Sequence, residues 1–209
     1  MKILAVSDQV IDSLYNPAIR DNFHDIDLLI GCGDLPYNYL EFFVSILNAP
    51  LLYVPGNHDP KYNPDNPATI AEGCTNIDLK LVRVKGLTLA GAGGSIRYQP
   101  EGVNQYSQAG MSLRLASLAP RLAWNKLVKR KPLDVLVTHS PPFGIHDEDD
   151  PAHTGFKSLR TLIKIFRPRL LLHGHTMFYR QNLVSPETDW GGTRIVNVYP
   201  FRRIEIEHV

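Results

Sequence analysis

The chain of 209 residues is 44% hydrophobic and 21% charged, which is the balance of a globular protein with a substantial core. Its formal net charge of +1 excludes a general electrostatic attraction to nucleic acid or to an anionic membrane. We therefore expect one domain over residues 1–209, with neither a membrane nor a nucleic acid as its partner.

Apolar runs and apolar–polar alternation predict the strands of the chain. They fall at residues 2–7, 27–31, 51–54, 80–84, 87–91, 133–138, 169–173, 179–184, 193–198 and 203–207. Strands that alternate with helices indicate βαβ units and parallel pairing. The closely spaced strands at 179–207 have no helix between them, which predicts hairpins added to a second sheet.

Helical periodicity appears in three segments between these strands. One begins after Pro36, a second covers 111–122 with a break at Pro120, and a third covers 156–166 and ends before Pro168. The basic run that follows the second segment is typical of a solvated helix end, and it consists of Lys126, Lys129, Arg130 and Lys131.

Several features predict a cytoplasmic location. Residues 1–6 form a strand pattern without the charged leader and small-residue cleavage site of a secretory signal. No apolar run approaches the ~20 residues that cross a bilayer. The two cysteines, Cys32 and Cys74, are too few for a disulfide framework and suit a reducing compartment.

Potential metal ligands follow five of the predicted strands, and they are Asp8, Asp34, Asn57, His139 and His175. Because binding sites of α/β proteins lie at the carboxyl ends of their strands, we expect these side chains to converge. Carboxylate, amide oxygen and imidazole ligands suit Mn, Fe or Zn. Gly33, Gly56 and Gly174 permit tight turns that direct the next side chain toward the site.

The polar strand ends also occur as ordered motifs, namely Gly33-Asp34, Gly56-Asn57-His58-Asp59, Thr138-His139 and Gly174-His175. In order and context they resemble the calcineurin-like metallophosphoesterases, over Met1 to about Tyr199. The resemblance implies a four-layer αββα fold, in which two mixed β-sheets are sandwiched between α-helices.

The resemblance also implies roles for individual residues. Asp34 would bridge two metal positions, and Asn57, His139 and His175 would complete one of them. Asp8 would belong to the other position. His58 would not bind metal but would contact the phosphate and protonate the leaving oxygen.

Two motifs depart from the family pattern. The D-x-H motif reads Asp8-Gln9-Val10, and the G-H-x-H motif reads Gly174-His175-Thr176-Met177. Both absent imidazoles belong to the same metal position, and neither valine nor a methionine thioether replaces them for Mn or Zn.

Two hypotheses follow from this departure. In the first, one ion binds to Asp34, Asn57, His139 and His175, and Asp8 orients water or supports the ligands through hydrogen bonds. In the second, a second ion binds because other residues replace the lost ligands, the candidates being Asp12, His146, Asp147, Asp150 and His153.

The glycine-rich loop from Gly91 to Tyr98 offers a further substrate contact. Arg97 could pair bidentately with a phosphate, although a surface arginine is the alternative.

These residues predict a metal-dependent hydrolase of phosphomonoesters or phosphodiesters, with nucleotides among its small substrates. A metal ion lowers the pKa of its bound water from ~15.7 toward ~7, which supplies hydroxide to attack phosphorus. The alternative is a binding protein that uses a degenerate one-metal site to hold a nucleotide or phosphate with little or no turnover. The sequence predicts neither the natural substrate nor the oligomeric state.

Overall fold

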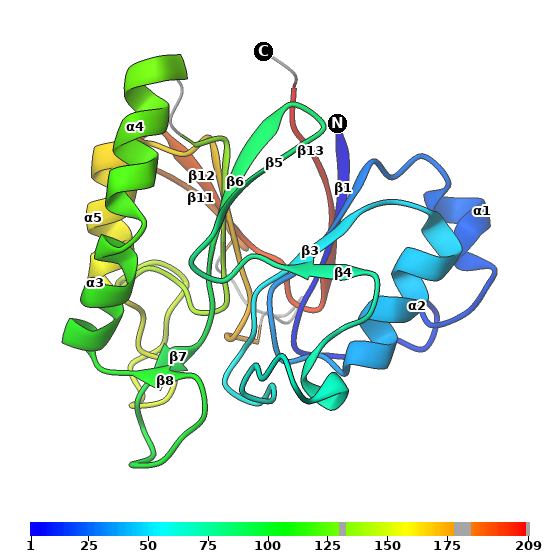
Figure 1. Ribbon diagram of the computed structural model, residues 1–209, viewed down its shortest axis with the longest axis horizontal. Coiled ribbons are helices and arrows are strands. Elements are labelled where there is room, and N and C mark those ends of the chain that lie inside the picture. The colour runs from blue at the N-terminus through cyan, green and yellow to red at the C-terminus, as the bar shows by residue number, and fades with distance from the viewer. Residues whose placement is uncertain (130–132, 178–184, 208–209) are drawn as a thin grey trace.

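The computed structural model describes residues 1–129, 133–177 and 185–207. Two large mixed sheets face one another, and helices cover the outer side of each (Figure 1). This order of layers confirms the predicted four-layer αββα fold. None of the helices in the described part of the chain is long and apolar enough to cross a membrane.

The first sheet has five strands in the order β13-β1-β2-β3-β4. Its parallel strands are β1 (Lys2–Val6), β2 (Leu28–Gly31), β3 (Leu51–Tyr53) and β4 (Cys74–Asn76). The last strand, β13 (Phe201–Glu205), pairs antiparallel with β1. Helices α1 (Ile19–Phe23) and α2 (Tyr37–Leu47) cover its outer face.

The second sheet has six strands in the order β11-β12-β10-β9-β6-β5. Its strands are β5 (Leu81–Val84), β6 (Leu87–Ala92), β9 (Val135–Thr138), β10 (Leu170–His173), β11 (Glu187–Trp190) and β12 (Thr193–Asn197). The central strands are parallel, and β5 and β11 pair antiparallel at the two edges. Helices α3 (Gln108–Ala116), α4 (Ala119–Lys129) and α5 (Lys157–Phe166) cover the outer face.

The central strands are buried on both faces, which explains their continuous apolar runs. Ile3, Leu28, Leu89, Val137 and Leu172 pack between the sheets and are at most 3% exposed. Each such side chain contributes about 1.5–3 kcal/mol of burial free energy. The rigid double layer holds the carboxyl ends of its strands in fixed positions.

Local signals set the helix boundaries as expected. Pro36 precedes α2, and Ser107 caps α3 by accepting a hydrogen bond from the Gly110 amide at 3.0 Å. α5 ends at Phe166, and the residue that caps it, Arg167, adopts a left-handed φ of 47° just before Pro168. The predicted break near Pro120 is confirmed, because Pro120 lies in the first turn of α4 and starts a new helix there.

Some segments differ from expectation. The expected addition to the second sheet is confirmed for the strand predicted at 193–198, which is β12, and β12 forms its hairpin with β11, a strand that was not predicted. The expectation is wrong for β13, which joins the first sheet beside β1. Short elements without an apolar run were not predicted, namely α1, β4, the 3₁₀ turn Pro67–Thr69, the pair β7 (Ser95–Ile96) and β8 (Gln105–Tyr106), and β11. The strand expected at 179–184, Arg130 and Lys131 lie outside the described residues.

The two sheets come into contact at Gly91 of β6, which forms a bridge with Asp78 after β4. A Cβ atom on Gly91 would lie 2.5 Å from the Ile77 carbonyl oxygen and 2.7 Å from Val54 Cγ1. Only a residue without a side chain therefore fits between the sheets here.

We expect Gly91→Ala to lower the free energy of unfolding by about 1–3 kcal/mol, because the added methyl group forces the sheets apart. Denaturant unfolding measures this change. The matched control is Gly110→Ala in α3, whose Cβ would meet only Ser107 Oγ at 3.2 Å and the Tyr106 side chain at 3.8 Å. The control should unfold at the same denaturant concentration or higher. A Gly91→Ala protein as stable as the unchanged protein would contradict this account.

Candidate metal centre

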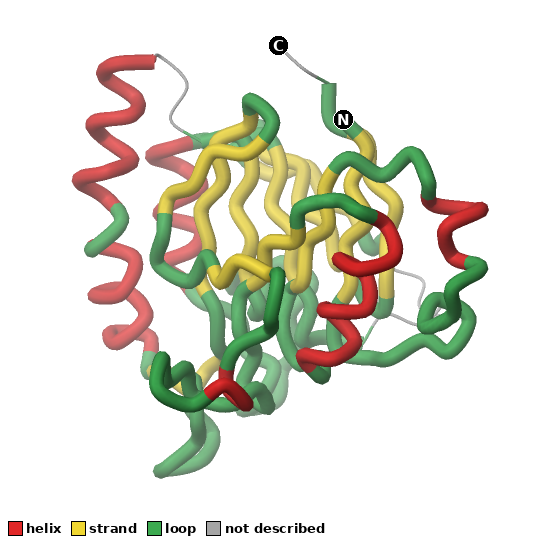
Figure 2. Tube along the Cα trace, turned by 45° about the vertical axis from the view of Figure 1, so that its right-hand side comes forward, coloured by secondary structure: helices red, strands yellow, loops and turns green. Residues whose placement is uncertain are grey.

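The expected ligands lie at the carboxyl ends of strands from both sheets. Asp8, Asp34 and Asn57 follow β1, β2 and β3 of the first sheet, while His139 and His175 follow β9 and β10 of the second. Loops gather at this end of the two sheets (Figure 2). The site therefore spans the edges of both sheets.

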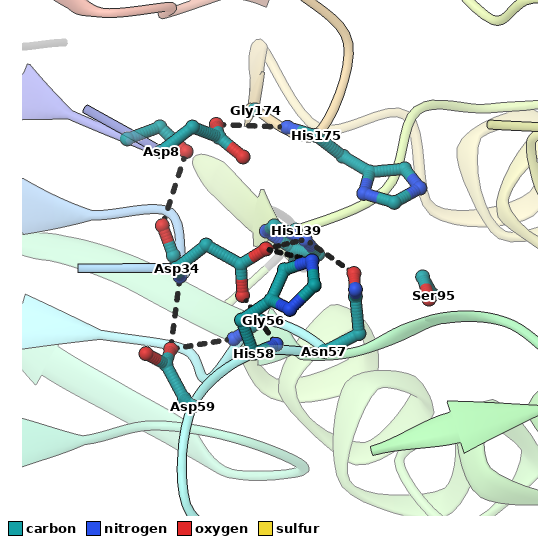
Figure 3. A network of polar contacts seen from close by, with 12 residues as sticks. Asp8, Asp34, Gly56, Asn57, His58, Asp59, Ser95, His139, Gly174 and His175 are labelled. Atoms are coloured by element: carbon teal, nitrogen blue, oxygen red, sulfur yellow. Dashed lines mark hydrogen bonds and ion pairs between the residues drawn. The ribbon is translucent and has the colours of Figure 1, made fainter. Parts of the chain in front are cut away.

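The structure brings the ligand atoms of Asp34, His139 and His175 within 4.8 Å of one another. His139 Nε2 lies 3.4 Å from Asp34 Oδ2 and 3.0 Å from Asn57 Oδ1 (Figure 3). Three of the four expected ligands thus gather within a few ångströms, and the fourth, Asn57, lies beside His139.

Backbone carbonyls fix the orientation of both imidazole rings. His139 Nδ1 lies 2.7 Å from the Cys32 carbonyl oxygen, and His175 Nε2 lies 2.8 Å from that of Ala152. Because a carbonyl only accepts, each of these nitrogens carries the hydrogen. The other nitrogen of each neutral ring then offers a lone pair, which is the usual arrangement of a metal-binding histidine.

This donor set fits a divalent cation. With His139 neutral, its Nε2 lone pair faces Asp34 Oδ2 and Asn57 Oδ1, and all three atoms are acceptors. Such atoms repel one another unless a cation lies between them. Either a proton on His139 or a metal ion satisfies that requirement.

The pKa values of the three clustered side chains show which of them carries a proton at neutral pH. Burial opposes a charge on Asp34 and on His139, but their mutual attraction lowers the pKa of Asp34 to about 2 and raises that of His139 to about 9. Burial and the charge of His139 lower the pKa of His175 to about 3. At neutral pH, Asp34 is therefore ionised, His175 is neutral, and His139 holds one proton that a bound metal would displace.

Unusual backbone conformations aim the side chains at the site. Gly33 has a φ of 93°, and a Cβ atom there would lie 2.6 Å from His139 Nδ1. Asp8, Asp34 and His175 also adopt positive φ, at 62°, 56° and 67°. Positive φ in non-glycine residues costs about 1–3 kcal/mol each and clusters at functional sites.

Asp59 ties two of these loops together, a role that the sequence did not predict. Its Oδ2 accepts hydrogen bonds from the Asp34 amide at 2.9 Å and the Gly56 amide at 2.7 Å. Burial raises its pKa to about 6. In the sequence, the only indication of a role for Asp59 in the site is its position at the end of the motif Gly56-Asn57-His58-Asp59.

Asp8 and His58 lie on different sides of the ligand group. Asp8 Oδ2 accepts a hydrogen bond from the His175 amide at 2.9 Å. The His58 amide donates to Asp34 Oδ1 at 2.8 Å, and its imidazole is 73% exposed, with Nε2 3.9 Å from Asp34 Oδ2. Beside it lies a cleft of about 350 Å³ lined by Asp34, Tyr37, His58 and Pro60, among others. His58 is thus placed between the ligands and solvent.

Arg97 is exposed, and its Nη2 donates to the Gln105 carbonyl at 3.3 Å. Its contact with a phosphate stays a prediction.

Most of the proposed replacement ligands contact other groups. Asp12 is exposed, Asp147 accepts from the Gly155 amide, and Asp150 lies 2.7 Å from His153 Nδ1. His146 bonds to His173 and Thr188. The ring of His153 lies 5.0 Å from that of His175, so this candidate is beside a ligand. Binding of a second ion stays a prediction.

Comparison with known proteins agrees with the geometry. The family model of calcineurin-like phosphoesterases matches residues 1–179. The chain belongs to this family. One curated relative is an uncharacterized protein of Methanocaldococcus jannaschii. It is 27% identical to this chain over 180 residues, and the alignment covers 81% of this chain and 76% of the relative.

Solved structures share the calcineurin-like fold. TT1561 of Thermus thermophilus aligns with a TM-score of 0.60 and 20% identity, over 94% of this chain and 88% of its own. Another solved chain aligns with a TM-score of 0.63 and 18% identity, over 94% and 90%. At these identities the likeness concerns the fold alone.

Tyr98 contacts the expected ligand Asn57 from the glycine-rich loop, and the sequence did not single it out as a site residue. Its hydroxyl accepts a hydrogen bond from Asn57 Nδ2 at 3.2 Å, which keeps Asn57 Oδ1 directed at His139.

We expect Tyr98→Phe to weaken Mn²⁺ or Zn²⁺ binding about tenfold, because the side-chain amide of Asn57 can then rotate. Isothermal titration calorimetry measures the affinity. Tyr62→Phe, at an exposed tyrosine, should leave it unchanged, and equal affinities for both variants would contradict this role of Tyr98.

Metal binding should release protons. Because the pKa of His139 is raised to about 9, the metal-free protein holds this proton at pH 7 and loses it on binding. We expect about one proton released per ion at pH 7, and an affinity that rises about tenfold per pH unit until it levels off near pH 9. Calorimetry in buffers of different ionisation enthalpy measures both. Binding without proton release would show that His139 is already neutral.

Proposed function

We propose that this protein is a metal-dependent hydrolase of small phosphomonoesters or phosphodiesters, with nucleotides among its substrates. The observation that carries the proposal is the group of Asp34, His139 and His175, with the exposed imidazole of His58 at its mouth. A family of phosphoesterases supports the same reaction class. The free cysteines Cys32 and Cys74 support a cytoplasmic location.

Each residue has a defined part in this reaction. Asp34, Asn57, His139 and His175 would hold one Mn, Fe or Zn ion, which when bound supplies positive charge to phosphoryl oxygens and acidifies water. His58 reaches the solvent side, where its imidazole can bond to the phosphate and protonate the leaving oxygen. The cleft beside His58 would take the organic part of a small ester.

Asp8 would act without a second ion. One oxygen accepts from the His175 amide, so Asp8 helps to set the turn that carries a ligand. Its other oxygen can accept a hydrogen bond from a water molecule and orient it. Val10 and Met177, in place of imidazoles, support this one-ion arrangement.

The second candidate function is binding of a nucleotide or phosphate with little turnover. The same two substitutions favour it, because a single ion offers less stabilisation to the transition state than a pair of ions.

We expect His58→Ala to lower the turnover of bis-p-nitrophenyl phosphate or p-nitrophenyl phosphate at least about 100-fold, because the proton donor is lost. Assays with Mn²⁺, Zn²⁺ or Mg²⁺ measure the rate, and calorimetry should show unchanged metal affinity. The matched control is His24→Ala, at an exposed histidine of the α1 end, which should retain full activity. Saturable nucleotide binding without turnover under any metal would instead identify a binding protein.

A further inference from the structure

The helical layer over the second sheet exposes large apolar side chains. They are Leu113 of α3, Trp124, Leu127 and Val128 of α4, and Ile165 of α5. Trp124 is 69% exposed and Leu127 is 77% exposed. Scattered apolar residues are normal on a surface, but a group on adjacent helices marks a contact site.

α4 is apolar on the side that faces solvent. Leu122 and Asn125 are buried against the protein, while Trp124 and Leu127, three residues apart, lie on the outer side together with Val128. An ordinary surface helix places charged residues there. The outer face of α4 is therefore suited to being covered.

The charge of this layer differs from the charge of the chain. All 21 acidic residues lie outside α3, α4 and α5. The three helices carry only basic charges, which are Arg114, Arg121, Lys126, Lys129, Lys157, Arg160 and Lys164. Arg114 pairs with Asp78 beside the sheet, at 2.7 Å, so its charge is compensated. The net charge of +1 therefore averages a basic helical layer with a remainder that is acidic overall.

Charge complementarity selects an anionic occupant. A second copy of the chain that docks through the same face would bring basic residues against basic residues, which opposes a symmetric dimer. The buried parts of protein interfaces are also poor in lysine. The surface of an anionic bilayer supplies an apolar layer for tryptophan and leucine together with phosphate charges for lysine and arginine.

The shape of the molecule permits this contact. α4 stands at the outer edge of the molecule and extends beyond the end of the second sheet (Figure 1). The metal centre lies at the carboxyl ends of the strands, on loops that do not include α4. Docking through α4 is therefore compatible with an accessible metal centre.

We propose that the outer face of α4, with Leu113, docks on an anionic phospholipid bilayer. Trp124, Leu127 and Val128 enter the interfacial layer, and Arg121 and Lys126 contact the headgroup phosphates. This docking surface is separate from the proposed hydrolase function. The net charge of +1 led us to expect no membrane partner, but that value averages the basic helical layer with the acidic remainder of the chain.

Vesicle binding tests the proposal. The full chain is mixed with phosphatidylglycerol vesicles or with phosphatidylcholine vesicles, and binding is measured by co-sedimentation and tryptophan fluorescence. We expect the protein to sediment with phosphatidylglycerol vesicles only, and its tryptophan emission to shift to the blue only with these vesicles. In 1 M salt the binding should be at least about tenfold weaker. Binding to neither vesicle, or equal binding to both, overturns the proposal.

Matched variants locate the contact. Leu127→Glu should weaken phosphatidylglycerol binding at least about tenfold, because it places a negative charge in the apolar face. Val103→Glu makes the same change at an exposed apolar residue outside these helices and should bind as before. Equal loss in both variants overturns the assignment to α4. A concentration-dependent dimer that Leu127→Glu abolishes in sedimentation would assign the face to a second copy of the chain and overturn the proposal too.

Discussion

The contact between Asp34 and His139 is the interaction on which the site depends. Asp34 follows β2 of the first sheet and His139 follows β9 of the second, so their 3.4 Å contact joins the edges of the two sheets. Burial opposes the charge on each, and each is charged because the other is near. A bound cation would satisfy the same acceptors, Asp34 Oδ2 and Asn57 Oδ1, as the proton on His139. Gly33 makes the contact possible, since its missing side chain leaves room for the ring of His139.

Much of the fold and the ligand group could be predicted because both follow from burial. Strands covered on both faces must be apolar, so the polar residues that end them are visible in the sequence. Three of these, Asp34, His139 and His175, come together as expected. β11 was missed because its residues alternate between exposed and half-buried positions at a sheet edge and form no apolar run. The sheet that β13 joins was also not predictable, since strand order depends on the path of the chain after β12.

Sequence patterns could not predict the contacts that orient the ligand side chains. The carbonyls of Cys32 and Ala152 set the orientation of the two imidazoles, and any residue type supplies a carbonyl. The role of Asp59 depends on two backbone amides brought together by folding. Val10 is partly buried and packs against the apolar cluster that includes Ile19 of α1 and Tyr39 of α2, so that position contributes apolar contact where the family pattern has an imidazole.

A chain of hydrogen bonds supports the second sheet's side of the site from behind. The Gly174 carbonyl can only accept from His173 Nδ1, at 3.0 Å, so His173 Nε2 accepts from His146 Nδ1 at 2.9 Å. His146 Nε2 then accepts from the Thr188 hydroxyl of β11, also at 2.9 Å. This order requires both rings to be neutral, and burial lowers the pKa of each in agreement.

His146 therefore serves a purpose different from the metal ligand considered from the sequence. Both of its ring nitrogens are engaged in fixing the turn at Gly174. That turn carries His175, whose amide bonds to Asp8 and whose ring completes the ligand group. A strand at the sheet edge is thus linked to the candidate ligand group through two neutral imidazoles. The hydrogen bonds thus connect the packing of β11 to the turn that carries His175, even though Thr188 lies 13 residues after His175 in the sequence.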